Sequence, residues 1–115
     1  MNKQDQMRHV ALREIGCLVA YMRGLGFVPA EVHHLLTTQR HGTGKRRGEQ
    51  FTIALNPWSH RGVPFGGWTA EQCRKELGPS YAREPRLFRE QFGDDETLLA
   101  KQNELIATWR NSFVV

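Results

Sequence analysis

The sequence predicts an α+β fold in which a small two-stranded hairpin is surrounded by helices. Two short segments, residues 31–36 and 51–55, have the residue types of strands, and the glycine-rich loop between them is consistent with a hairpin. The last third of the chain instead repeats apolar residues at helical spacing. The length of 115 residues fits one compact unit, so we expect a single domain over residues 1–115.

The first half of the chain opens with a predicted helix over residues 7–23. Gly24 and Gly26 should end this helix, because glycine commonly follows the last helical turn. Residues 31–36 form the first predicted strand. The second, residues 51–55, alternates apolar with small or polar residues and should be half-buried. Pro57 suits the first turn of a short helix that follows this strand.

The last third predicts three helices. Thr69 and Gln72 have the spacing of a capping box, which opens a helix that runs to about Leu77. A second short helix should cover residues 86–92 and end at Gly93. Asp94 or Asp95 then caps a longer helix. Its apolar stripe consists of Leu98, Leu99, Leu105, Ile106, Trp109 and Phe113.

Positive charge is concentrated in the first part of the chain. Residues 1–67 carry nine lysines and arginines against four acidic residues, and residues 68–115 carry seven against eight. This asymmetry suggests a polyanionic partner, although an excess of this size is also common in proteins that bind no nucleic acid. Because no apolar run is long enough to span a bilayer and the first six residues are polar, we expect a cytoplasmic protein without a membrane partner. The two cysteines, Cys17 and Cys73, should be free thiols.

Two consecutive histidines, His33 and His34, lie within the first predicted strand. Alternation along a strand points their side chains to opposite faces. One could then be a metal ligand and the other a general base, since neutral imidazole serves either purpose. The alternative is a structural histidine beside a solvent-exposed one.

A third histidine, His60, follows the second predicted strand in the short helix. A strand histidine, a basic glycine-rich loop, a second strand and a helical histidine follow one another as in the ββα-metal, or HNH, nucleases. In such a site one hard cation neutralises the scissile phosphate and the leaving oxygen while a histidine activates water.

Longer segments carry a family resemblance from about Ile15 to Ile106. They are Ile15-Gly16-Cys17, residues 24–27, residues 29–35 (Pro-Ala-Glu-Val-His-His-Leu), residues 55–64 (Leu-Asn-Pro-Trp-Ser-His-Arg-Gly-Val-Pro), residues 78–83 (Gly-Pro-Ser-Tyr-Ala-Arg) and residues 88–93 followed by Asp94-Asp95-Glu96. In these segments the chain resembles the phage and prophage recombination-enhancement (Ref-like) nucleases, which are RecA-dependent members of the HNH group.

The resemblance implies a small ββα-metal (HNH-like) hairpin-helix module flanked by an N-terminal helix and C-terminal helices. It implies that His33 and His60 are ligands of a catalytic divalent cation, Mg²⁺ or Mn²⁺, and that His34 is the general base. Pro64 stands where some HNH enzymes place a further ligand, and it cannot coordinate through its side chain. DNA and a RecA-type recombinase filament are the implied partners.

The chain departs from the family at a structural zinc site. Family members carry C-x-x-C where this chain has Cys17 and Ala20, and a cysteine and a histidine where it has Asn56 and Ser59. Structural zinc takes about four nitrogen or sulfur ligands, and only Cys17 remains. We therefore expect that structural zinc is lost, that Leu18 and Ala20 fill its place by apolar packing, and that Cys17 is buried.

Several basic residues are candidate phosphate contacts. They are Arg40, Lys45, Arg46 and Arg47 in the glycine-rich loop, and Arg61 beside His60. In isolation the loop residues could equally be solvated, and Arg61 could instead cap the short helix. We expect His9 and His41 to be solvated surface residues, and Trp58, Trp68 and Trp109 to be core aromatics.

Two functions from different classes follow from these observations. The first is a divalent-metal-dependent DNA endonuclease or nicking enzyme of phage or prophage recombination that acts with a recombinase filament. The second is a catalytically weak or inactive DNA-binding accessory protein that retains the fold. The three histidines favour the first function, and the damaged zinc site is the argument for the second.

Overall fold

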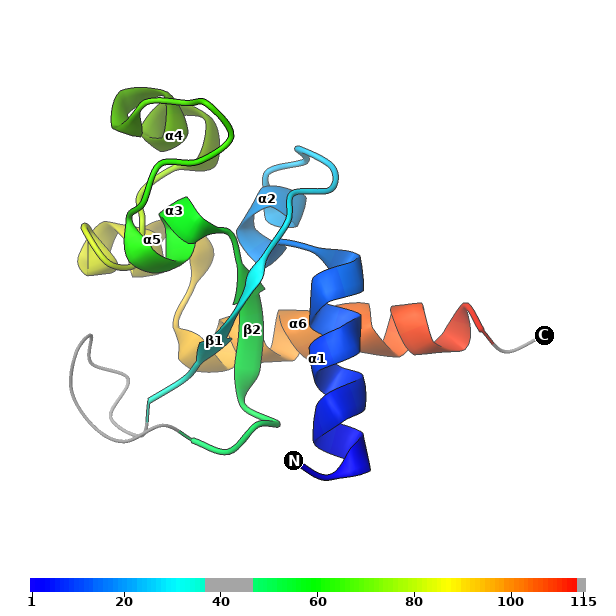
Figure 1. Cartoon of the computed structure of the whole chain (residues 1–115). Helices are drawn as coiled ribbons and strands as arrows, with labels where there is room; N and C mark the ends of the chain where they lie inside the picture. Colours follow the sequence, from blue (N-terminus) through cyan, green and yellow to red (C-terminus); the bar gives the residue numbers. More distant parts are fainter. Residues whose placement is uncertain (37–46, 114–115) are drawn as a thin grey trace.

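The structure is a computed structural model that describes residues 1–36 and 47–113 (Figure 1). A two-stranded hairpin lies among helices, so the predicted α+β class is confirmed. The elements are α1 (Lys3–Ile15), α2 (Leu18–Met22), β1 (Glu31–His34), β2 (Thr52–Leu55), α3 (Pro57–Arg61), α4 (Ala70–Leu77), α5 (Pro85–Phe92) and α6 (Asp95–Asn111). No helix in the described part of the chain is long and apolar enough to cross a membrane.

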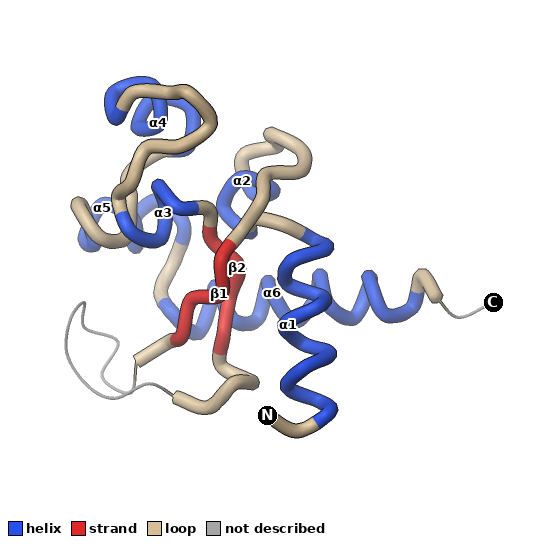
Figure 2. Tube along the Cα trace, in the orientation of Figure 1, coloured by secondary structure: helices blue, strands red, loops and turns tan. Residues whose placement is uncertain are grey.

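The strands β1 and β2 lie side by side (Figure 2) and pair antiparallel, with Glu31 opposite Leu55 and His34 opposite Thr52. All four residues of β2 are buried, so the expected half-buried strand is wrong. The reason is the cover on its outer side, where the side chain of Gln102 on α6 accepts a hydrogen bond from the Ala54 amide at 2.9 Å. The Gln102 side chain thus supplies the hydrogen bond that a neighbouring strand would otherwise provide, and the buried Ala54 amide is satisfied.

The N-terminal segment forms two helices, and the single helix expected over residues 7–23 is wrong. The chain breaks at Gly16, whose φ of 86° favours glycine. A Cβ atom there would lie 2.8 Å from the Val28 carbonyl oxygen. The next amide, that of Cys17, donates to the same Val28 carbonyl at 2.8 Å. A long-range contact between backbones therefore overrides the helical periodicity.

The later helices begin where capping chemistry places them. The capping box of Thr69 and Gln72 is present, and Asp94 caps α6 by accepting from the Thr97 amide. Helix α5 begins at Pro85, one residue before the expected start. Asn56 caps α3 by accepting from the Ser59 amide at 2.7 Å. The caps of α4 and α6 form as predicted, and α5, which begins at a proline without a side-chain cap, is also present.

The core forms between the hairpin and the surrounding helices, with α1 and α3 on opposite sides of the hairpin in Figure 1. Trp58 is buried in it, as expected, beneath the guanidinium group of Arg83. Trp68 is 42% exposed, and Phe113 at the end of the predicted α6 stripe is 64% exposed, so neither is a core residue. The hairpin thus meets a different helix on each flank.

Candidate active site

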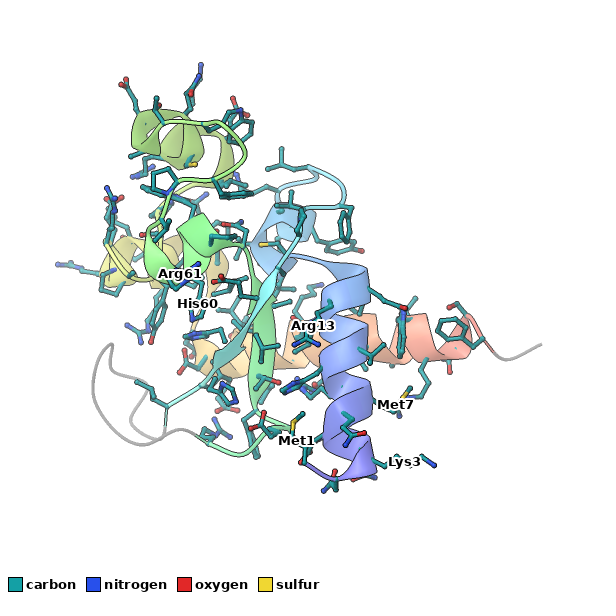
Figure 3. The ribbon with its side chains drawn as sticks, in the orientation of Figure 1. Met1, Lys3, Met7, Arg13, His60 and Arg61 are labelled. Carbon is teal, nitrogen blue, oxygen red and sulfur yellow. The ribbon has the colours of Figure 1, made fainter. Side chains whose placement is uncertain are left out.

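His33 and His60 meet on the α3 flank of the hairpin. His33 comes from β1 and is buried, and His60 lies in the last turn of α3 beside Arg61 (Figure 3). Their rings are 4.8 Å apart between centroids and are inclined by 72°. The sequence predicts that these two histidines converge, and the structure brings them together.

Glu31 orients the His60 ring. Its Oε1 atom lies 3.0 Å from Nδ1 of His60, which makes Nδ1 the protonated nitrogen and leaves the Nε2 lone pair available. Arg61 holds the same carboxylate through two hydrogen bonds, Nε to Oε1 at 2.8 Å and Nη2 to Oε2 at 2.6 Å. This carboxylate–histidine arrangement is the usual outer shell of a metal-binding imidazole.

The electrostatics keep the His60 ring neutral and the Glu31 carboxylate charged. Burial lowers the pKa of His60, and the hydrogen bond to Glu31 opposes that effect only in part. The hydrogen bond from Arg61 lowers the pKa of Glu31. A neutral imidazole with a free lone pair is the form that binds a cation.

His34 lies on the opposite face of β1, toward α1, as the alternation predicts. Its Nε2 atom is 2.9 Å from Oε2 of Glu49, in the turn before β2. His9 of α1 reaches the same Oε2 atom at 2.8 Å. His9 is partly buried, with a side chain only 13% exposed, so the expected solvated surface histidine is wrong.

The three histidines of the predicted site therefore form a pair and a neighbour rather than one cluster. His33 and His60 are in ring contact, and His34 is held by Glu49 on the other face. A charge on His34 makes only the smallest contribution to the lowered pKa of His60. The third imidazole thus lies on the other face of β1 from the pair.

Sequence reasoning missed three residues around these histidines. Tyr81 packs behind His33 with ring centroids 4.9 Å apart, and Glu31 and Glu49 bind the two other histidines. Glu31 precedes His33 by two residues on a strand and so shares its face, which is a signal that alternation offers. The turn before β2 places Glu49 beside His34, and no local sequence pattern marks Glu49 as a site residue.

The four positions at which the resemblance implies zinc ligands in the family lie together in the core. Cys17 Sγ accepts from the backbone amide of Asn56 at 3.3 Å and from its Nδ2 at 3.2 Å. Cys17, Ala20, Asn56 and Ser59 are all buried, as expected for Cys17 and Ala20. Burial raises the pKa of the Cys17 thiol, although the amide of Ala20 and the amides of Val19 and Asn56 oppose this. Cys17 and Cys73 are both free thiols, as predicted.

Asn56 thus fills the zinc-ligand position with a polar group that caps α3 and hydrogen-bonds the remaining sulfur. The expected apolar replacement at Leu18 and Ala20 is present, and the Asn56 bonds are an addition to it. One sulfur, one amide and one hydroxyl do not fit structural zinc.

The candidate DNA contacts are only partly described. Arg40, Lys45 and Arg46, together with His41, lie outside the described residues. Arg47 forms an ion pair with Glu96 at 2.5 Å and lies over the Phe51 ring. Arg61 is bound to Glu31, although its side chain is half-exposed. Both described arginines therefore have protein partners.

One comparison with known proteins gives a match. The family model described as "Recombination enhancement, RecA-dependent nuclease" matches residues 2–107. Neither the curated proteins nor the solved structures yield a match. The matched range contains every residue of the candidate site.

Proposed function

Since the chain belongs to the recombination-enhancement family of RecA-dependent nucleases, we propose that it is a divalent-metal-dependent DNA endonuclease or nicking enzyme of the HNH (ββα-metal) type. The observation that carries this proposal is the ring contact of His33 and His60, together with the hydrogen bond between Glu31 and Nδ1 of His60. The elements that supply these residues are two antiparallel strands followed by a short helix.

His33 and His60 would hold the cation, Mg²⁺ or Mn²⁺. The two imidazoles, one of them oriented by a carboxylate, would be the protein ligands, and water and phosphate oxygens, which Mg²⁺ prefers, would fill the other positions. When bound, such an ion neutralises the scissile phosphate and stabilises the leaving oxygen. The role of Glu31 is to fix the His60 tautomer, and Arg61 keeps Glu31 charged and in place.

His34 would act as the general base. Its Nε2–H donates to Glu49, so Nδ1 is the nitrogen that accepts a proton from water. The negative charge of Glu49 stabilises the imidazolium that forms, as a buried carboxylate does beside other catalytic histidines. The pKa of Glu49 is lowered by its hydrogen bonds to His34 and His9, which keeps this carboxylate ionised.

DNA would approach from the side of the basic residues. Arg40, Lys45, Arg46 and Arg47 are the proposed phosphate contacts, and they would position the backbone without reading sequence. Arg61, already bound to Glu31, would present its exposed edge to a phosphate. The family description also supports action with a RecA-type filament in recombination. A phage or prophage setting for this recombination is part of our proposal.

Cleavage of a supercoiled plasmid tests the proposal. We expect nicked product with Mg²⁺ or Mn²⁺ in the presence of a RecA-type filament, and none with chelator. The His33→Ala/His60→Ala variant should be inactive, whereas Glu84→Gln, which changes a surface ion pair with Arg74, should cleave normally. Cleavage that persists in chelator would contradict metal dependence. DNA binding without cleavage under every condition would support the accessory function instead.

A further inference from the structure

A second cluster of metal-binding side chains lies on the α1 flank of the hairpin. Its members are His9 of α1, His34 of β1 and Glu49 of the turn before β2. One ligand atom from each lies within 4.8 Å of the other two. Three elements distant in sequence therefore direct a nitrogen, a nitrogen and an oxygen toward one point.

The geometry is close to that of a tetrahedral metal site. His9 Nε2 and His34 Nε2 lie 2.8 and 2.9 Å from the same carboxylate oxygen, Glu49 Oε2. Ligands about 2.1 Å from a zinc ion in tetrahedral geometry are about 3.4 Å apart. Binding of the ion would lengthen the two contacts to Glu49 by about half an ångström and bring the two nitrogens, which lie within 4.8 Å of each other, to about 3.4 Å.

The backbone around the cluster is anchored independently of any ion. Arg8, the neighbour of His9, is buried and donates from Nε to Thr52 Oγ1 at 2.9 Å and from Nη2 to the Thr52 carbonyl at 2.6 Å. Thr52 Oγ1 in turn donates to the Glu49 carbonyl at 2.8 Å. These bonds fix α1, β2 and the turn relative to one another, so the three ligands are held near one another before binding.

The chemistry of the donor set selects the metal. Two imidazoles and one carboxylate form a known zinc ligand set, in which the fourth position is open to water. The side chains of His9 and His34 are 13% and 15% exposed, and that of Glu49 is 31% exposed. Solvent thus reaches the cluster from the Glu49 side, where a water ligand can enter.

We propose that His9, His34 and Glu49 form a Zn²⁺ site, separate from the His33 and His60 pair. Binding requires each imidazole to lose its Nε2 proton and to take up a proton at Nδ1, so both rings change tautomer with no net proton release and bind through the Nε2 lone pair. Zinc then joins α1 to the hairpin. A further consequence, which rests on the proposed function, is inhibition of cleavage, because a zinc-bound His34 is a poor base.

The binding test uses a His33→Ala/His60→Ala background, which removes the other imidazole pair. Calorimetric titration with Zn²⁺ should give one ion per chain and a higher melting temperature. Adding His9→Ala should weaken binding more than the 10- to 100-fold that loss of an outer-shell partner costs. Glu49→Gln retains the side-chain shape and should weaken binding as well. It decides the question if His9→Ala fails to fold.

Two outcomes would overturn the zinc site: no Zn²⁺ binding by the background protein, or binding that neither His9→Ala nor Glu49→Gln weakens.

The inhibition of cleavage is tested separately, in protein with the wild-type His33 and His60 pair, by Mg²⁺-dependent plasmid nicking. The Zn²⁺ concentration for half-inhibition should rise at least tenfold in His9→Ala, and an unchanged value would overturn the inhibition. If no nicking occurs at all, the proposed function fails while the calorimetric result still decides the zinc site.

Discussion

Glu31 and His60 are joined by a hydrogen bond of 3.0 Å between Oε1 and Nδ1, across the gap between the first strand and the short helix. This bond decides which nitrogen of His60 can face a cation, because the protonated Nδ1 is turned toward the carboxylate. A side chain at the start of β1 thereby determines the chemistry of a ring on α3.

Removing the charge of Glu31 should weaken cation binding. We expect Glu31→Gln to lower Mn²⁺ affinity at the His33 and His60 pair by about 10- to 100-fold, the usual cost of losing an outer-shell carboxylate. Electron paramagnetic resonance of free Mn²⁺ measures this change. Glu84→Gln, which also alters an arginine-bound surface glutamate, should leave the affinity unchanged. Equal Mn²⁺ affinities of the two variants would show that Glu31 does not contribute to cation binding.

Introducing zinc ligands at the positions that the resemblance implies should create a structural zinc site. The triple variant Ala20→Cys/Asn56→Cys/Ser59→His adds three ligands around Cys17, since these positions are buried together. We expect it to bind one additional zinc ion and to unfold when a chelator removes that ion. Metal analysis and chelator-dependent melting measure both effects.

The corresponding control is Cys17→Ser in the otherwise unchanged chain. It should not alter the metal content, because a lone thiol does not hold structural zinc. A loss of zinc on this substitution would show that Cys17 is a ligand after all, and a triple variant without additional zinc would show that the core no longer admits the ion.

The basic loop should contribute to the salt dependence of DNA binding. Replacing Lys45, Arg46 and Arg47 together by alanine should lower the slope of log affinity against log salt by about 1 to 2, below the value of about 2.7 for three full phosphate contacts. The Arg47 and Glu96 pair is one reason for the smaller value, because Arg47 must leave Glu96 to reach a phosphate. Fluorescence anisotropy over a salt series measures the slope for unrelated DNA sequences.

A charge-matched variant provides the comparison. Lys3, Arg13 and Lys101 lie on α1 and α6, and Lys3 and Arg13 are seen on the α1 side in Figure 3. Their joint replacement should change the slope by less than that of the loop residues. If both variants change it equally, net charge rather than the loop sets the affinity.

Acid should weaken the cap of α6. The hydrogen bond from the Thr97 amide lowers the pKa of Asp94 below its ordinary value of 3.8. The folded state therefore binds its proton less readily than the unfolded state, and this stabilisation is present above about pH 3.8 and lost as pH falls through the folded pKa. Denaturant unfolding of wild type and Asp94→Asn should show a stability difference that shrinks on acidification. A difference that is constant with pH would exclude this role of the charge.

The sequence was most informative where the determinants are local. The capping box at Thr69 and the cap at Asp94 involve residues within one helical turn, and both form as predicted. The opposite orientations of His33 and His34 follow from strand alternation alone, and they are confirmed. Strand alternation thus predicted that the two histidines lie on opposite faces of the hairpin.

Features that depend on distant residues escaped prediction. The helix break at Gly16 is made by Val28, and the burial of β2 depends on Gln102 of α6. His9 has no motif around it, and its partner Glu49 is 40 residues away in the sequence, on the turn next to Thr52, to which Arg8 anchors α1. Periodicity describes one element at a time, so it does not contain such contacts.

The most direct test of the account separates cation binding from catalysis in a single variant, His34→Ala. Substoichiometric Mn²⁺ should broaden the imidazole signals of His60 in the wild type and in this variant alike, because His34 is not a ligand in the proposed site. The DNA cleavage rate should nevertheless fall by about 100- to 10,000-fold, the usual effect of removing a general base. A His34→Ala protein that retains more than half of the wild-type cleavage rate would contradict the account.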